Sequence, residues 1–198
     1  MLNALSLDDE DMIQKVFETL TDFLEAKKVM QPHLEIVVQA AISVSRNTNL
    51  SFNVRESTIY FLENFGDNFG KHMAKKQMTN MLQQIVETGF IIASESTEEY
   101  ADDEESPHTL ALYMLYNYAS EVPNNVVYPI FKQLVLQYNQ HPDPLFKRAA
   151  LKILGHVSDN DGLLDCIKED VEEMTNIVIG GLTDQNQIVR EGAAVCVG

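Results

Sequence analysis

Apolar residues recur every three or four positions along most of the chain, with polar residues between them. In the first segment of this kind, Ile13, Phe17 and Leu24 fall on one helical face, which is typical of a helix that packs one side against a neighbour. The same period returns along the sequence and predicts an all-α protein with nine helices. We expect them at about 8–28, 32–47, 53–65, 71–93, 107–122, 125–138, 144–154, 163–179 and 185–198.

Capping residues and glycines predict where these helices begin and end. Ser106–Pro107 and Asp143–Pro144 each combine an N-cap residue with a proline at the first helical position, where the missing N–H has no intrahelical partner to lose. Gly66 and Gly70 are predicted to bracket one turn, and the segment 155–162, which begins and ends with glycine, is predicted to form another.

Three arginines mark a repeat of the helical pattern. Arg55, Arg148 and Arg190 each lie near the start of the first helix of a pair, and the second and third are 42 residues apart. Arg55 and Arg190 are separated by 135 residues, or three intervals of 45. A helix pair that recurs at roughly 40–47 residues is typical of HEAT and armadillo arrays, whose neighbouring pairs stack into a continuous core and a curved surface.

This period favours a right-handed α-α superhelix, a HEAT-repeat solenoid, with about four helix pairs and one unpaired helix. An irregular helical bundle is the alternative. The whole chain, 1–198, is then a single array, and because its last helix has no partner we expect a fragment of a longer protein. The repeats are expected at about 8–47, 53–93, 106–140 and 143–182, with the start of another at 185–198 and an acidic loop at 94–106.

Composition and charge narrow the function classes. Hydrophobic residues make up 45% of the chain, which argues against wholesale disorder. With no apolar run near the ~18 residues of a membrane span and no basic-then-apolar leader after Met1, we expect a soluble protein that is not exported and binds no membrane. Cys166 and Cys196 are expected to be reduced thiols. The net charge of −16 repels nucleic acid and favours basic partners.

Motifs of catalysis and cofactor binding are missing from the sequence. It contains no GxSxG, GxxxxGKS/T, GxGxxG or HExxH pattern. Its five histidines are scattered singly, so we expect no metal site. We therefore expect a protein that is not an enzyme and has no catalytic residues, no cofactor and no small-molecule substrate.

Acidic residues concentrate in two places. The segment 94–106 holds seven carboxylates and no basic residue, so we expect a loop whose acidic side chains are solvated. A linker between helices commonly needs only about two to eight residues. The other cluster lies on the eighth predicted helix, the second of its pair, and second helices line the concave face of a HEAT array. Either cluster can attract basic proteins; the alternatives are a spacer that blocks self-association and a solvated helix face. The protein-binding candidates are Glu95, Glu98, Glu99, Asp102, Asp103, Glu104, Glu105, Glu169, Asp170, Glu172 and Glu173.

Two long stretches resemble a known family. The first, PHLEIVVQAAISVSRNTNLSFNVRESTIYFLENF from Pro32, joins a PH-started helix through a polar N-T-x-L turn to a VR-started helix. The second, ESPHTLALYMLYNYASEVPNNVVYPIFKQLV and then HPDPLFKRAALKILGHVSD, follows the acidic loop with a helix that ends in an EVP turn and a helix that starts at DP. Their order and spacing resemble the importin-beta (karyopherin-beta) nuclear transport receptors, nearest to the importin subunit beta-4 type, over nearly the whole chain.

The resemblance implies a fragment from the N-terminal to middle HEAT repeats of an import receptor. Such a receptor binds basic cargo (histones and ribosomal proteins), Ran-GTP and Phe-Gly nucleoporins, in the cytoplasm, the nucleus and the nuclear pore, and its acidic loop captures cargo in competition with Ran. It also implies that Tyr60 and Tyr116, which lie off the main apolar stripes, line grooves for Phe-Gly repeats, with peripheral core packing as the alternative. The alternative function is a HEAT scaffold subunit of a phosphatase or chromosome-associated complex.

Overall fold

The computed structural model describes residues 9–75, 78–95 and 106–197. Within these ranges every regular element is a helix, and no strand occurs. Short 3-10 turns at Gln31–His33 and Gly70–His72 join the longer helices. The α-helices are α1 (Glu10–Phe23), α2 (Lys27–Met30), α3 (Leu34–Ser45), α4 (Phe52–Phe69), α5 (Thr79–Ala93), α6 (Pro107–Glu121), α7 (Asn124–Asn139), α8 (Pro144–Ser158), α9 (Asp161–Glu169), α10 (Val171–Leu182) and α11 (Gln187–Val197).

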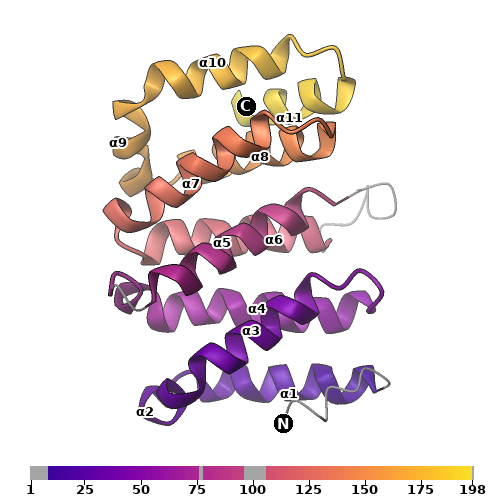
Figure 1. Ribbon diagram of the computed structural model, residues 1–198, viewed down its shortest axis with the longest axis vertical. Coiled ribbons are helices and arrows are strands. Elements are labelled where there is room, and N and C mark those ends of the chain that lie inside the picture. Colours follow the sequence, from indigo (N-terminus) through magenta and orange to yellow (C-terminus); the bar gives the residue numbers. More distant parts are fainter. Residues whose placement is uncertain (1–8, 76–77, 96–105, 198) are drawn as a thin grey trace.

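The helices form two layers (Figure 1). The first layer consists of α1, α4, α6, α8 and α11, and α3, α5, α7 and α10 cross them obliquely in the second layer. In the first layer α1 packs against α4, α4 against α6 and α8 against α11, and in the second layer α5 packs between α3 and α7. The stack extends along one axis from α1 to α10 and α11 (Figure 1). This arrangement confirms the predicted helical solenoid.

Aromatic rings run through the core along the stack. Phe17 on α1 meets Phe61 on α4 edge-on, with 5.6 Å between ring centroids, and Phe65 continues the row along α4. Phe90 on α5 lies 6.0 Å from Phe131 on α7. All five rings are at most 2% exposed. Because a buried side chain of this size contributes ~1.5–3 kcal/mol, such contacts join successive pairs into one core.

None of the helices in the described ranges is long and apolar enough to cross a bilayer.

The predicted N-caps are confirmed. Ser106 Oγ accepts a hydrogen bond from the backbone N–H of Thr109 at 3.3 Å, and Asp143 Oδ1 accepts one from Leu145 at 2.9 Å. Each cap is followed by a proline at the start of its helix. Asp9 caps α1 in the same way, by accepting a backbone hydrogen bond from the first turn.

The three repeat arginines share one structural role. Arg55 donates from Nε to the carbonyl of the last residue of α3 at 2.9 Å. Arg148 donates to the carbonyl of Glu95, two residues after α5, at 2.8 Å, and Arg190 donates to a carbonyl two residues after α10 at 2.8 Å. An arginine at this position therefore donates to the backbone at, or two residues after, the C-terminal end of a second-layer helix. This shared contact gives the sequence period a physical cause.

Three glycines that were expected in turns lie inside helices, so that prediction is wrong. Gly66 belongs to α4, Gly155 to α8 and Gly162 to the first turn of α9. A Cβ atom on Gly66 would lie 3.0 Å from Oδ1 of Asn117 on α6, and one on Gly155 would lie 2.7 Å from Cα of Cys196 on α11. Gly66 and Gly155 allow neighbouring first-layer helices to approach closely.

Two predicted helices are each divided, which corrects their expected bounds. The helix expected at 163–179 consists of α9 and α10, which meet at Asp170, where φ is −111° and ψ is 22°. The helix expected at 8–28 ends at Phe23, and Lys27 begins the separate helix α2. Buried apolar residues lie on both sides of each break. The apolar period therefore continues through the breaks and does not reveal them.

Candidate functional site

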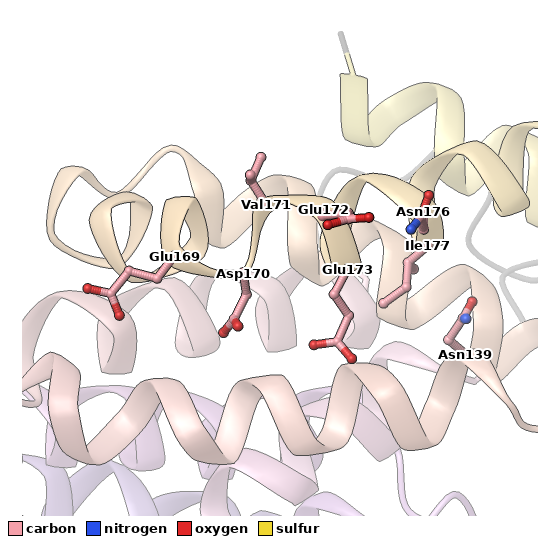
Figure 2. Close-up of a pocket in the computed structure, with 8 residues that line it drawn as sticks. All are labelled: Asn139, Glu169, Asp170, Val171, Glu172, Glu173, Asn176 and Ile177. Carbon is pink, nitrogen blue, oxygen red and sulfur yellow. The ribbon is translucent and has the colours of Figure 1, made fainter.

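The first candidate site is an acidic groove at the junction of α9 and α10, beside α7 (Figure 2). It has a volume of about 710 Å³. It brings together all four acidic residues that the sequence placed on the eighth helix. The groove is lined by Asn139, Glu169, Asp170, Val171, Glu172, Glu173, Asn176 and Ile177.

Helix ends determine how these carboxylates are spaced. Glu169 is the last residue of α9, Asp170 separates the two helices, and Glu172 and Glu173 lie in the first turn of α10. Acidic side chains in a first turn are stabilised by the partial positive charge of the helix N-terminus, each by about 0.3–1 kcal/mol. Asp170 and Glu173 point toward α7, whereas Val171 points away from it (Figure 2). The break at Asp170 thus aims part of the acidic run at a neighbouring helix.

Lys132 on α7 neutralises part of the acidic groove. Its Nζ lies 2.8 Å from Oδ1 of Asp170 and 2.9 Å from Oε2 of Glu173. Tyr128, also on α7, donates its hydroxyl hydrogen to Oδ2 of Asp170 at 2.9 Å. Hydrogen bonds from Lys132 and Tyr128 hold the pKa of Asp170 below its ordinary value, and hydrogen bonds to Asp170 and Glu173 raise the pKa of Lys132. The Lys132–Asp170 pair therefore stays charged at neutral pH.

Glu169 and Glu172 complete the acidic groove and are exposed. In the part of the chain that the structure describes, neither has a cationic partner within ion-pair distance. Nor do the described residues include any group of three or more His, Cys, Asp or Glu side chains arranged to hold a metal ion. The groove can instead attract a lysine- or arginine-rich segment through several exposed pairs, each contributing ~0.2–1 kcal/mol.

The second candidate site is a tyrosine groove between the first-layer helices α4 and α6. Its volume is about 460 Å³, and it brings Tyr60 and Tyr116, the two tyrosines singled out from the sequence, to one surface. Tyr60 is 42% exposed and Tyr116 is half-buried. The groove is lined by Tyr60, Glu63, Leu110, Tyr113, Tyr116, Asn117, Ser120 and Glu121.

Sequence reasoning missed Tyr113, the most exposed ring of the tyrosine groove at 52%. His156 on α8 contacts two of the rings, with centroid distances of 5.7 Å to Tyr113 and 5.4 Å to Tyr116. Burial lowers the pKa of His156, so this imidazole is neutral at pH 7. The spacing of three residues between Tyr113 and Tyr116 places both rings on one face of α6 and could have identified the pair.

Glu95 differs from the acidic segment to which the sequence assigned it. Its carboxylate accepts two hydrogen bonds from Arg55, at 2.6 and 2.8 Å, and Arg55 is only 5% exposed. The expectation of a solvated Glu95 side chain is therefore wrong, because the chain uses this carboxylate to neutralise a buried guanidinium. The other candidates of the segment lie outside the described residues: Glu98, Glu99, Asp102, Asp103, Glu104 and Glu105.

The chain shares the fold of the karyopherin Kap121p. It matches Kap121p bound to RanGTP with a TM-score of 0.84 and 20% identity over 95% of the chain. It matches Kap121p bound to Pho4p and bound to Nup53p with TM-scores of 0.85 and 0.86, each at 19% identity over 98% of the chain. These matches cover 19–20% of Kap121p, so the chain spans about a fifth of its length. No family model matches the chain.

Proposed function

We propose that the chain is a segment of a nuclear import receptor of the importin-beta family, nearest to the importin subunit beta-4 type, and that it binds basic cargo. The helical solenoid that it shares with Kap121p supports the receptor class, since Kap121p has been solved with RanGTP, Pho4p and Nup53p. The family resemblance of the sequence supports the same class. The observation that carries the proposal is the acidic groove on the second layer of helices.

Coulombic attraction explains how such a groove would hold a histone tail or a basic segment of a ribosomal protein. The carboxylates near α10 are exposed, so each ion pair with cargo contributes only ~0.2–1 kcal/mol and several must form together. Their summed field also speeds the encounter with a cationic partner. Since salt screens exposed charges over ~10 Å at 0.1 M, cargo affinity should fall as ionic strength rises.

A titration of the 198-residue chain with a fluorescently labelled histone-tail peptide tests this proposal. The variant Glu169→Gln, Glu172→Gln and Glu173→Gln should bind about tenfold more weakly at low salt, because the two carboxylates without a cationic partner are lost and the charge of Lys132 is no longer shared with Glu173. The control replaces three exposed carboxylates elsewhere, as Glu18→Gln, Asp22→Asn and Glu35→Gln, and changes the net charge equally. Equal weakening by the two triple variants would mean that the peptide senses only the net charge, and the groove would not be the cargo site.

Ran-GTP separates an import receptor from the alternative HEAT scaffold subunit. A full-length protein that contains this chain should release the labelled peptide when Ran-GTP is added and should retain it with Ran-GDP. A permanent scaffold would hold its partner in both cases. The receptor would act in the cytoplasm, at the nuclear pore and in the nucleus.

The acidic segment 94–106 is proposed as a second element that captures cargo in the same receptor. Uniform negative charge favours an extended segment through self-repulsion, and such a polyanion can compete with Ran for basic cargo. In the full-length protein, serine should replace six carboxylates, and the affinities for the histone-tail peptide and for Ran-GTP should be measured at two salt concentrations. Unchanged affinities and unchanged salt dependence would show that the segment is only a spacer. The six are Glu98, Glu99, Asp102, Asp103, Glu104 and Glu105.

The tyrosine groove is proposed as a Phe-Gly binding surface, because it places Tyr60 and Tyr116 together between two first-layer helices. A phenylalanine ring can enter such a groove in edge-to-face contact with tyrosine, a geometry that contributes ~0.5–1.5 kcal/mol beyond the buried area. Titration with a Phe-Gly peptide should shift the NMR signals of both tyrosines. An absence of shifts at both positions would rule out this surface.

A further inference from the structure

The lining of the tyrosine groove combines aromatic rings with carboxylates, and none of the described residues that line it is basic. Tyr60, Tyr113 and Tyr116 contribute the rings, and Glu63 and Glu121 contribute the carboxylates. Tyrosine faces and carboxylates share an attraction for cations. We infer that the tyrosine groove binds a cationic side chain of a partner protein, an arginine guanidinium held between the tyrosine rings and the carboxylate of Glu63.

Glu63 is the carboxylate of this groove that an incoming cation would stabilise most. Its side chain is half-buried on α4, and in the part of the chain that the structure describes no lysine, arginine or histidine lies within ion-pair distance of it. Asp67, one turn further along α4, adds like charge, and burial together with Asp67 raises the pKa of Glu63. A half-buried carboxylate beside a second carboxylate gains more from an incoming cation than a fully solvated one does.

The rings complete the recognition of a guanidinium. Tyr113 is 52% exposed, so its ring is accessible to a partner. His156 backs Tyr113 and Tyr116, and because burial lowers its pKa it brings no positive charge to the groove at pH 7. Arginine fits this surface better than lysine, since its planar guanidinium can stack on an aromatic face while it donates to a carboxylate.

This inference rests on the proposed use of the groove for Phe-Gly segments and adds a charge requirement to it. Under the inference, a segment whose phenylalanine lies beside an arginine binds in preference to a neutral one. Charge complementarity is the reason, because the described lining of the groove presents two carboxylates and no cation to an occupant. A partner with acidic residues beside its phenylalanine is disfavoured by the same charges.

Three labelled peptides test the requirement on the 198-residue chain: Gly-Phe-Gly-Arg-Gly-Phe-Gly and its counterparts with glutamine or glutamate at the central position. We expect the arginine peptide to bind about tenfold more tightly than the glutamine peptide, from one cation–π contact and one partly desolvated ion pair. The glutamate peptide should bind most weakly. If the arginine and glutamine peptides bind equally, the inference is overturned while the Phe-Gly proposal stands, and if none binds, both are overturned.

Variants locate the preference in the tyrosine groove. Glu63→Gln should reduce the tenfold preference for arginine to about twofold and leave the glutamine peptide unaffected, whereas Glu35→Gln, at an exposed position on α3, should keep it. Tyr113→Leu should lower the preference while Tyr113→Phe keeps it, because phenylalanine retains the aromatic face. A preference that survives Glu63→Gln would mean that the arginine binds elsewhere, and the inference would be wrong.

Discussion

The acidic groove and the tyrosine groove differ in whether their carboxylates already have a cationic partner within the protein. In the acidic groove Lys132 already pairs with Asp170 and Glu173 at 2.8 and 2.9 Å. In the tyrosine groove Glu63 is half-buried and has no such partner within the described ranges. The groove with more acidic residues is therefore partly neutralised by the protein itself, whereas the groove with fewer keeps its charge uncompensated.

The number of carboxylates in a groove therefore does not by itself determine how strongly the groove attracts a cation. Exposed carboxylates attract cations weakly, and a built-in lysine reduces that attraction further. A desolvated and unpaired carboxylate interacts more strongly with each cation that reaches it. The acidic groove therefore suits a long basic segment that makes many weak contacts, and the tyrosine groove suits a single well-placed arginine.

Glu95, a carboxylate that is both paired and enclosed, extends the comparison and gives the largest expected effect. Glu95→Ala should lower the free energy of unfolding by about 3 kcal/mol, because it leaves the guanidinium of Arg55 buried without a counter-charge. The side chains of Arg55 and Glu95 are 6% and 22% exposed, which places the expected loss near the lower end for buried pairs. Urea denaturation of the 198-residue chain measures it.

The control is Glu98→Ala, three residues further along the acidic segment 94–106, where the sequence predicts a solvated side chain. It should change stability by less than about 0.5 kcal/mol, as a surface substitution does. Equal effects at positions 95 and 98 would contradict the distinction between an enclosed carboxylate and the rest of the run.

Lys132→Met should strengthen the binding of a histone-tail peptide to the acidic groove. The substitution removes the cation that now pairs with Asp170 and Glu173, so both carboxylates become available to cargo. We expect about a fivefold increase in affinity at low salt, which corresponds to one or two exposed pairs. Fluorescence anisotropy with the labelled peptide measures this change.

Lys168→Met is the matched control for Lys132→Met. Lys168 pairs with Asp165 at 2.9 Å on α9, and neither residue lines the acidic groove. The control therefore makes the same change in net charge without freeing a carboxylate in the groove. An equal gain from both variants would show that the peptide responds to overall charge, and a loss of affinity with Lys132→Met would show that this lysine organises the site.

The sequence predicted the fold well because helix periodicity and capping are local signals. Ser106 and Asp143 cap helices where expected, and the apolar period located the core. Gly66 and Gly155 were misread because a turn and a close helix contact both require a missing side chain. Only the packing of α4 on α6 and of α8 on α11 separates these two uses.

The candidate sites were likewise predicted only where the signal is local in the sequence. The run from Glu169 to Glu173 was found because its members are neighbours in sequence. Lys132 and His156 were not connected with either site, because each comes from another helix and reaches its groove only through stacking. Composition could not distinguish Glu95 from the other carboxylates of the acidic segment 94–106, since its pairing with Arg55 spans 40 residues.

Glu63→Gln gives the smallest expected effect and tests the charge state of the tyrosine groove directly. Burial and the charge of Asp67 raise the pKa of Glu63 in the folded protein above its ordinary value of 4.5. The folded state then binds this proton more tightly than the unfolded state does. Stability therefore falls as the pH rises from the unfolded pKa through the folded one, and this loss persists at pH 7.

Because glutamine does not ionise, the variant Glu63→Gln should be more stable than the wild type at pH 7, and the gain should shrink as the pH falls toward 4.5. Urea denaturation at pH 7 and pH 5 measures the difference. Glu18→Gln, at an exposed position in the middle of α1, reports the stabilisation that follows from removing any one charge from a chain of net charge −16. A gain no larger than that of Glu18→Gln, or a gain equal at both pH values, would mean that solvent or another group already compensates the Glu63 carboxylate, and the contrast between the two grooves would not hold.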